Sequence, residues 1–204
     1  EKSDLLEASG ASSATLQALV AKEVFTLVEQ EVSRLSGVEA DLAAEFILSP
    51  PQQEALNQLK ASLQEKEVCL VHGVTASGKT EIYIRLIEEY LAKGKQVLYL
   101  LPEIGLTTQV IQRLQKIFGT KIGVYHSKFN DNERAEIWQK VLNGDYQIVL
   151  GARSAVFLPF NNLGLVVVDE EHENSFKQFD PAPRYHARDS AIFLASLFKA
   201  KVVL

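Results

Sequence analysis

A chain of 204 residues suits one α/β domain together with a small appendage. Its hydrophobic fraction of 47% and charged fraction of 23% are those of an ordinary globular protein, and its net charge of −5 leaves nucleic-acid binding open. The single cysteine, Cys69, excludes an internal disulfide and a zinc-ribbon site within this chain.

The sequence also bears on cellular location and completeness. No apolar run reaches the length of a transmembrane helix and no signal-peptide pattern opens the chain, so we expect a cytoplasmic protein with no membrane partner. The chain begins at Glu1, contains no methionine and stops within an apparent strand. We therefore expect it to be a piece of a longer protein.

Residues 1–36 are predicted to form a separate unit. A short helical pattern stops at Gly10, and Ser12 or Ser13 can cap a second helix. Residues 25–32 then show an imperfect β-like alternation. This order is that of a winged helix-turn-helix without its first helix, which would present the second helix to a DNA groove. The alternative is that these helices only pack on a neighbouring part of the protein.

Residues 37–49 have the composition of a linker into the next domain. Two prolines then precede a helical pattern over 52–66 whose leucines are spaced for one face. Gln52 or Gln53 at its start is well placed to read the edge of an adenine. A solvent-facing glutamine would have the same pattern.

The stretch 68–80 predicts a strand, a glycine-bounded loop and the start of a helix. Residues 68–72 are mostly apolar and predict a strand buried on both faces of a parallel sheet. The next eight residues, GVTASGKT, fit the pattern G-x-x-x-x-G-K-[ST] without a mismatch. Residues 81–94 then predict a helix that ends at Gly94.

This loop predicts a nucleoside-triphosphate site, because each residue type has a task there. The two glycines let backbone amides turn toward phosphate oxygens. Lys79 should reach the β- and γ-phosphates, and the Thr80 hydroxyl should ligate Mg²⁺. The residues that we expect to contact the nucleotide are Gly73, Thr75, Ser77, Gly78, Lys79 and Thr80. The plain alternative is a glycine turn before an ordinary helix.

Strand-like and helix-like runs alternate through the rest of the chain. Strands are predicted at 95–102, 121–127, 163–172 and 201–204, and 146–157 predicts a further strand that leads into a loop. Helices are predicted at 103–119, 130–144 and 186–200. We expect Trp138 to lie in the core. This alternation predicts an α/β fold with a mostly parallel sheet covered by helices on both faces.

The strand at 163–172 delivers an acidic cluster, DEEH, at its carboxyl end, where open α/β sheets bind their ligands. Asp169 should hold Mg²⁺ directly or through water, and Glu170 should orient and deprotonate the attacking water. The Asp–Glu pair favours a hydrolase, because a kinase needs no second carboxylate to activate water. The alternative is a solvated acidic turn.

Two further segments are candidates for DNA contact. Arg153 and Ser154 follow a strand and can grip phosphates of DNA or nucleotide. After the acidic cluster, residues 176–188 mix aromatic and basic side chains, which suits stacking on unpaired bases. An aromatic loop packed on the sheet would look the same, so the composition leaves both interpretations open.

With these residues in view, the chain resembles the PriA family of bacterial replication-restart helicases, a part of superfamily 2. The matching blocks are LSPPQQEAL, HGVTASGKTEIY, LLPEIGLTTQ, VYHSKFNDNER, GARSAVFLPFNNLGLVVVDEEH and SFKQFDPAPRYHARDSA, in family order. The resemblance implies that residues 50–204 form the first RecA-like lobe of a P-loop NTPase. It implies that residues 1–36 are the end of a winged-helix domain and that 37–49 are a linker.

The resemblance also implies roles for individual residues. Gln52 matches the adenine-reading glutamine, 78–80 match motif I, and Asp169, Glu170 and His172 match motif II. Motifs Ia and Ib, both along single-stranded DNA, match 102–107 and 151–154, and 175–188 match a loop that couples DNA binding to hydrolysis. The implied DNA-binding or coupling residues are Pro102, Thr107, Arg153, Ser154, His172, Lys177, Arg184, Tyr185 and Arg188.

The family's activity follows as an expectation. It is ATP-dependent 3′-to-5′ unwinding at stalled forks, with ATP and Mg²⁺ in this lobe and zinc only outside this fragment. Expected partners are forked and single-stranded DNA, other primosome proteins and single-stranded DNA-binding protein. The second lobe with its arginine finger and motif III are absent from this sequence, so the fragment alone should hydrolyse ATP weakly or not at all. Two alternatives are a double-strand DNA translocase and an ATP-switched fork-binding module.

Overall fold

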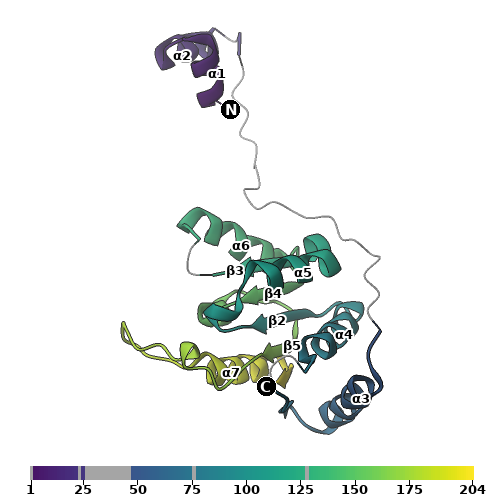
Figure 1. The fold of residues 1–204 in the computed structure, drawn as a ribbon. Coiled ribbons are helices and arrows are strands. Elements are labelled where there is room, and N and C mark those ends of the chain that lie inside the picture. The colour runs from purple at the N-terminus through teal and green to yellow at the C-terminus, as the bar shows by residue number, and fades with distance from the viewer. Residues whose placement is uncertain (1, 23, 26–46, 75–76, 127–128) are drawn as a thin grey trace. The chain divides into compact units, whose positions relative to one another are not determined.

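The computed structural model describes residues 2–22, 24–25, 47–74, 77–126 and 129–204 (Figure 1). The chain divides into two compact units, residues 1–34 and 35–204. The first contains helices α1 (Lys2–Ser9) and α2 (Ser13–Ala21), and the Ser12 side chain caps α2 by accepting a hydrogen bond from the Thr15 N–H. The predicted β-like segment and linker lie mostly outside the described residues, so the winged helix stays a prediction.

The second unit is built on a six-stranded sheet with the order β1-β6-β5-β2-β4-β3. All five strand pairs are parallel. The strands are β1 (Val68–Cys69), β2 (Gln96–Leu100), β3 (Ile122–Tyr125), β4 (Ile148–Gly151), β5 (Leu163–Val168) and β6 (Lys201–Val203). Since parallel neighbours need crossover connections, helices separate most of them along the chain, and the predicted α/β class is confirmed.

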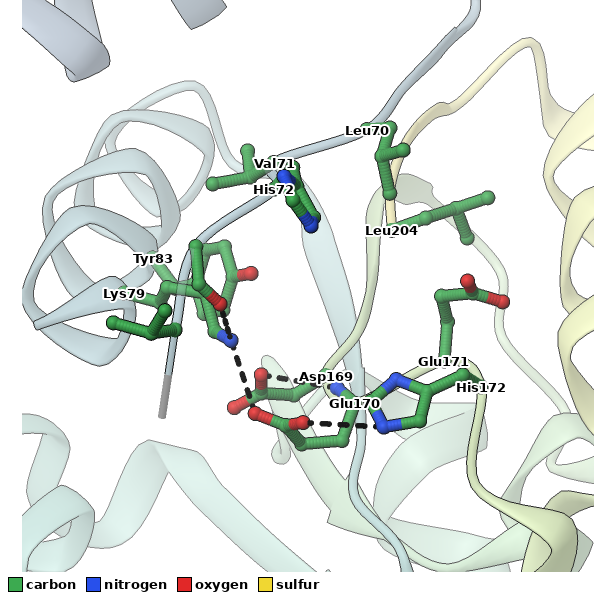
Figure 2. Close-up of a pocket in the computed structure, with 12 residues that line it drawn as sticks. Leu70, Val71, His72, Lys79, Tyr83, Asp169, Glu170, Glu171, His172 and Leu204 are labelled. Carbon is green, nitrogen blue, oxygen red and sulfur yellow. Dashed lines mark hydrogen bonds and ion pairs between the residues drawn. The ribbon is translucent and has the colours of Figure 1, made fainter. Parts of the chain in front are cut away.

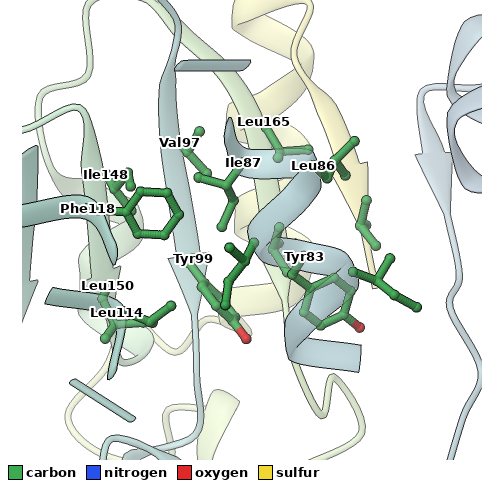
Figure 3. Packing of buried hydrophobic residues seen from close by; sticks show 14 of the residues in the cluster. Tyr83, Leu86, Ile87, Val97, Tyr99, Leu114, Phe118, Ile148, Leu150 and Leu165 are labelled. Carbon is green, nitrogen blue, oxygen red and sulfur yellow. The ribbon is translucent and has the colours of Figure 1, made fainter. Parts of the chain in front are cut away.

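The helices of this unit are α3 (Pro50–Glu65), α4 (Lys79–Ala92), α5 (Thr108–Phe118), α6 (Asp131–Asn143) and α7 (Ala187–Phe198). Buried residues form two clusters, one joining the sheet to α3, α4 and α5 and the other joining it to α6 and α7. Along β2, Val97 and Tyr99 belong to the first cluster (Figure 3), whereas Leu98 and Leu100 belong to the second. This alternation is the expected result of burying both faces of the sheet. No helix among the described residues has the length and apolar character needed to cross a membrane.

The register of the strands brings their carboxyl ends to one edge of the sheet. Leu100, at the end of β2, lies level with Gly151 of β4 and with Val168 of β5. The segments that follow β1, β2, β4 and β5 therefore leave the sheet at the same edge. Ligands of open α/β sheets bind at this edge, which makes it the place to look for a site.

The first predicted strand is wrong in length and in burial. Strand β1 has only two residues, and Val68 is 39% exposed because β1 is the outermost strand and pairs only with β6. Backbone hydrogen bonds continue the pairing a little further, since the Val71 N–H donates to the Leu204 carbonyl over 2.7 Å. An apolar run alone does not distinguish an edge strand from a central one.

The segment 146–157 forms strand β4 and then leaves the sheet as predicted, although a 3-10 helix, η3 (Arg153–Phe157), stands where a loop was expected. One prediction about α6 is wrong. Trp138, expected in the core, is 47% exposed. Ile137 and Val141 fill the buried face of α6, and the adjacent Trp138 side chain points about 100° away from that of Ile137 around the helix.

A buried glutamine ties the amino ends of the strands together. The Gln96 amide nitrogen donates to the carbonyls of Val141 and Tyr146 over 2.9 and 3.3 Å. Its amide oxygen accepts from the N–H groups of Asn161 and Asn162 over 2.9 and 3.0 Å. One side chain therefore bonds four backbone groups, of which the Val141 carbonyl also accepts from the Gly144 N–H.

Replacing Gln96 with Leu should therefore lower stability without changing side-chain size much. Each buried polar group left without a partner costs about 1–3 kcal/mol. Because water can reach some of the loop groups in the variant, we expect the free energy of unfolding to fall by about 3 kcal/mol in total. For a chain of this length that loss corresponds to a fall in Tm of about 6–12 °C. Differential scanning calorimetry measures it, with Gln139→Leu on the exposed face of α6 as the matched control. Equal Tm values for the two variants would contradict the prediction.

Candidate functional site

A pocket of about 270 Å³ lies at the carboxyl edge of the sheet (Figure 2). The segment after β1, the start of α4 and the acidic turn after β5 supply most of its wall. The lining residues are Leu70, Val71, His72, Gly73, Val74, Lys79, Tyr83, Asp169, Glu170, Glu171, His172 and Leu204. The structure thus brings together two motifs that lie about 90 residues apart in the sequence.

Two glycines shape the loop that enters α4. Gly78 is the N-cap of α4 and has a φ of 84°, a left-handed conformation that favours glycine. A Cβ on Gly73 would lie 2.9 Å from the Ser77 hydroxyl, so a side chain there would require Ser77 to move. The first N–H groups of the 14-residue helix have no partner within the helix and form an anion-binding end. Ser77 is exposed on this loop, and Thr75 lies outside the described residues.

Lys79 points across the loop toward the acidic turn (Figure 2). Its ammonium donates to the Gly73 carbonyl over 2.8 Å and to the Glu170 carboxylate over 3.0 Å. The Lys79 side chain is 14% exposed and that of Glu170 is 31% exposed, so the ion pair is partly buried and keeps one side open to solvent. An ammonium held at the mouth of a phosphate-binding loop is in the right place to meet an incoming triphosphate.

Asp169 lies deeper than its neighbours, with only 8% of its surface exposed. One carboxylate oxygen accepts from the Tyr99 hydroxyl over 3.0 Å and the other from the Glu170 N–H over 3.1 Å. Burial raises the pKa of the Asp169 carboxyl, and the hydrogen bond from Tyr99 acts in the opposite direction. Thr80, the other predicted Mg²⁺ ligand, follows Lys79 in the first turn of α4 and is half-buried.

Glu170 sits at the tip of the acidic turn in a conformation that is rare for its residue type. Its φ of 52° lies in the left-handed region, which a non-glycine residue adopts at a cost of about 1–3 kcal/mol. Its carboxylate lies between the Lys79 ammonium and the His172 ring, whose Nε2 is 3.8 Å away. The strained backbone thus holds the predicted general base against the phosphate-binding loop.

Gln52 lies against the same loop from the start of α3. Its amide oxygen accepts from the Ser49 N–H over 2.8 Å, which completes a capping box. Its amide nitrogen donates to the Gly78 carbonyl over 3.4 Å. The predicted adenine-reading residue is therefore next to the phosphate-binding loop, although it does not line the pocket itself.

The predicted DNA-contacting residues of motifs Ia and Ib follow β2 and β4 at this edge. Pro102 is buried directly after β2, and the Thr107 hydroxyl caps α5 by accepting from the Val110 N–H over 3.3 Å. Arg153 reaches across to the loop after the acidic turn and donates to the Lys177 carbonyl over 2.9 Å. Ser154 is half-buried beside it in η3. None of these residues lines the pocket.

The aromatic and basic segment forms a hairpin-like loop. Lys177 pairs with His186 through an antiparallel bridge, and the exposed Lys177 and Arg184 side chains lie on its two arms. The Tyr185 ring packs edge-on against Phe157, with 4.8 Å between the ring centroids. The contact of Tyr185 with Phe157 is what packing on the domain predicts, and the exposed Lys177 and Arg184 are what nucleic-acid binding predicts. Both interpretations of this segment therefore stay open.

Arg188 connects this segment to the acidic turn. Its guanidinium donates to the Glu171 carboxylate over 2.7 Å and to the Asp189 carboxylate over 2.9 Å. The sequence assigned Arg188 to DNA or coupling, and the structure places it in contact with the motif that holds Glu170. Glu171 had no predicted role, and only the fold reveals its partner.

The sequence reasoning also missed two tyrosines. Tyr83 of α4 lines the pocket, and the Tyr99 hydroxyl of β2 donates a hydrogen bond to the Asp169 carboxylate. Their rings meet edge-on, with 5.9 Å between the centroids. Burial raises the pKa of both hydroxyls. A tyrosine within an apolar run has the same signal as a core residue, so the sequence contained no cue to this role.

Comparison with known families identifies the class of protein. The model of the DEAD/DEAH box helicase family matches residues 49–196, which include both motifs of the pocket. The chain belongs to the DEAD/DEAH box helicase family. The matched region of this helicase chain begins at the cap of α3 and ends within α7, so it covers nearly all of the second unit.

The helicase chain is similar to curated proteins named replication restart protein PriA, so the resemblance seen in the motifs is confirmed. It is 44% identical to the one from Synechocystis over 98% of this chain and 24% of the relative. It is 40% identical to the one from Bacillus subtilis over 98% of this chain and 25% of the relative. The chain thus spans about a quarter of the length of these relatives.

Solved helicase structures share the fold. Mycobacterium smegmatis helicase Lhr, solved with single-stranded DNA and AMP-PNP, aligns with 80% of this chain and 25% of its own, with a TM-score of 0.55 and 19% identity. The DUF1998 helicase MrfA aligns with 79% of this chain and 26% of its own, with a TM-score of 0.53 and 18% identity. These likenesses confirm the predicted RecA-like α/β fold of the helicase lobe.

Proposed function

We propose that this chain is the first ATP-binding lobe of an ATP-dependent 3′-to-5′ DNA helicase that acts in replication restart. One observation carries the proposal: Lys79 of the phosphate-binding loop meets Asp169 and Glu170 of the acidic turn in one pocket. This is the pair of elements that ATP hydrolysis requires. The similarity to proteins named for replication restart supports the biological role.

In this proposal each part of the pocket has a separate task in binding ATP. The loop amides and the amino end of α4 surround the phosphates, and Lys79 neutralises charge on the β- and γ-phosphates. Gln52 reads the adenine edge beside Gly78, to which it already donates a hydrogen bond. Binding would draw Lys79 from Glu170 toward the phosphates, because a triphosphate carries more negative charge than one carboxylate.

Glu170 is then free to accept the proton of the attacking water. Its position on a strained turn, level with the loop, lets it face the γ-phosphate rather than solvent. A positioned carboxylate base contributes typically about 10²–10⁴ to the rate. The release of Glu170 by Lys79 would therefore link nucleotide binding to activation of the base.

The donors available fit a Mg²⁺ ion that arrives with the nucleotide. Such an ion needs only one or two protein oxygens, since phosphates and waters supply the others. The Asp169 carboxylate, which accepts from Tyr99, and the Thr80 hydroxyl at the start of α4 would hold it. When bound, the ion would neutralise negative charge that develops on the phosphates.

The wider proposal concerns domains and partners. Residues 1–36 would be the end of a winged-helix domain, 37–49 a linker and 50–204 the motor lobe. Forked and single-stranded DNA would lie along the edge that carries the segments after β2 and β4, with primosome proteins and single-stranded DNA-binding protein as further partners. A cytoplasmic location and zinc only outside this fragment belong to the same proposal.

The test is ATP hydrolysis by the full-length protein without DNA, with single-stranded DNA and with forked DNA. Strand displacement from substrates with a 3′ or a 5′ single-stranded tail is measured in parallel. We expect DNA to stimulate hydrolysis and displacement to require the tail that permits 3′-to-5′ movement. Stimulation by duplex without displacement would indicate a double-strand translocase, and hydrolysis that ignores DNA would indicate a fork-binding switch.

A further inference from the structure

Tyr99 combines deep burial with a polar contact that packing alone does not require. It lies in the middle strand pair of the sheet and is only 1% exposed. Its ring belongs to the cluster under α4 and α5 (Figure 3), where a phenylalanine ring would pack as well. A buried tyrosine hydroxyl needs a partner, and here it donates to the Asp169 carboxylate over 3.0 Å.

Tyr99 fixes one side of the Asp169 carboxylate. A tyrosine hydroxyl has a single proton to donate, and Tyr99 gives it to one of the two carboxylate oxygens. The other oxygen accepts from the Glu170 N–H over 3.1 Å. Since an ionised carboxylate has about four lone-pair sites, both oxygens can still accept a cation.

We propose that Tyr99 is a positioning residue for the Mg²⁺ site, orienting the Asp169 carboxylate before nucleotide arrives. The inference rests on the proposed function, which assigns this carboxylate to the metal. Carboxylate ligands of metals are themselves hydrogen-bonded, and losing such an outer partner typically costs about 10- to 100-fold in metal affinity or activity. Tyr99 would act through Asp169 and would not touch nucleotide or metal.

The experiment measures binding of fluorescent mant-ADP to the full-length protein, once with Mg²⁺ and once with EDTA. For Tyr99→Phe we expect mant-ADP affinity to fall about tenfold with Mg²⁺, since an outer partner of a metal ligand is lost. Affinity in EDTA should stay at the wild-type value, because the loop, Lys79 and the adenine contacts are intact. Equal losses in both conditions would mean a structural role and would overturn the inference, as would no loss at all.

Two controls separate the explanations. Tyr146→Phe removes a buried tyrosine hydroxyl before β4, at the opposite edge of the sheet, and should bind like wild type in both conditions. In an Asp169→Asn background, Tyr99→Phe should have no further effect on Mg²⁺-dependent binding, because the two side chains act as a unit. If the two substitutions lower Mg²⁺-dependent binding additively, the inference is overturned, whether or not Tyr99→Phe also lowers stability.

The same measurements distinguish failure of the inference from failure of the proposed function. If Lys79→Ala binds mant-ADP as wild type does, or if Mg²⁺ does not alter wild-type binding, the nucleotide site itself is misassigned and the inference falls with it. If both of those behave as expected and only Tyr99→Phe is neutral, the nucleotide site stands and Tyr99 is a core residue.

Discussion

Lys79→Ala should abolish nucleotide binding, with a loss of affinity of about 100-fold or more. The pocket wall carries three carboxylates, those of Asp169, Glu170 and Glu171, and the Lys79 ammonium lies among them. Removing it would place the phosphates against uncompensated negative charge. Truncating one member of a buried, hydrogen-bonded charge pair typically costs about 2–5 kcal/mol, and each 1.4 kcal/mol is tenfold in affinity.

The measurement is a titration of the full-length protein with mant-ATP and Mg²⁺. Lys95→Ala is the matched control, because Lys95 also hydrogen-bonds through its ammonium, to Asn162 over 2.7 Å, but directly before β2 at the opposite edge of the sheet. We expect this control to bind like wild type. Retained affinity in Lys79→Ala would show that the triphosphate does not occupy this loop.

Glu170→Gln should separate binding from chemistry. Glutamine has nearly the same shape but cannot accept the proton of the attacking water, so hydrolysis should fall by about 10²–10⁴. Nucleotide affinity should be kept or increased, because the neutral amide no longer competes with the phosphates for Lys79. This pattern is the reverse of that expected for Lys79→Ala, in which binding itself is lost.

Single-turnover hydrolysis and mant-ATP binding, measured on the same preparation, test this result. Glu173→Gln is the control, since its carboxylate lies in the same turn but does not line the pocket. It should hydrolyse ATP at a rate close to that of wild type. A Glu170→Gln variant that turns over normally would assign the general base to another group.

The motifs of the site could be predicted from sequence because their signals are local. The loop before α4 needs glycines at fixed spacing, and Asp169 follows an apolar run long enough to identify β5. That both segments reach the same edge follows from the parallel sheet, which the alternation of strands and helices predicted. That Lys79 and Glu170 belong to one site could be expected from these rules, whereas their direct ion pair is a finding of the structure.

What could not be predicted depends on which side chains meet across the sheet. In the sequence, Tyr99 is one member of an apolar run. Only the register of β2 and β5 places its hydroxyl within hydrogen-bonding distance of Asp169. Arg153 and Arg188 have the charge of DNA-binding residues, and nothing in the sequence reveals their protein partners. The edge position of β1 is likewise a property of strand order, which an apolar pattern does not report.

The contacts that Arg153 and Arg188 make within the protein affect how DNA binding would depend on salt concentration. Each cation that newly neutralises a DNA phosphate adds roughly 0.9 to the slope of log affinity against log salt. Arg188 would have to leave Glu171 and Asp189 to do so, which returns negative charge to the same surface. If DNA binds this lobe as proposed, its affinity should therefore depend on salt concentration less steeply than the number of basic residues suggests.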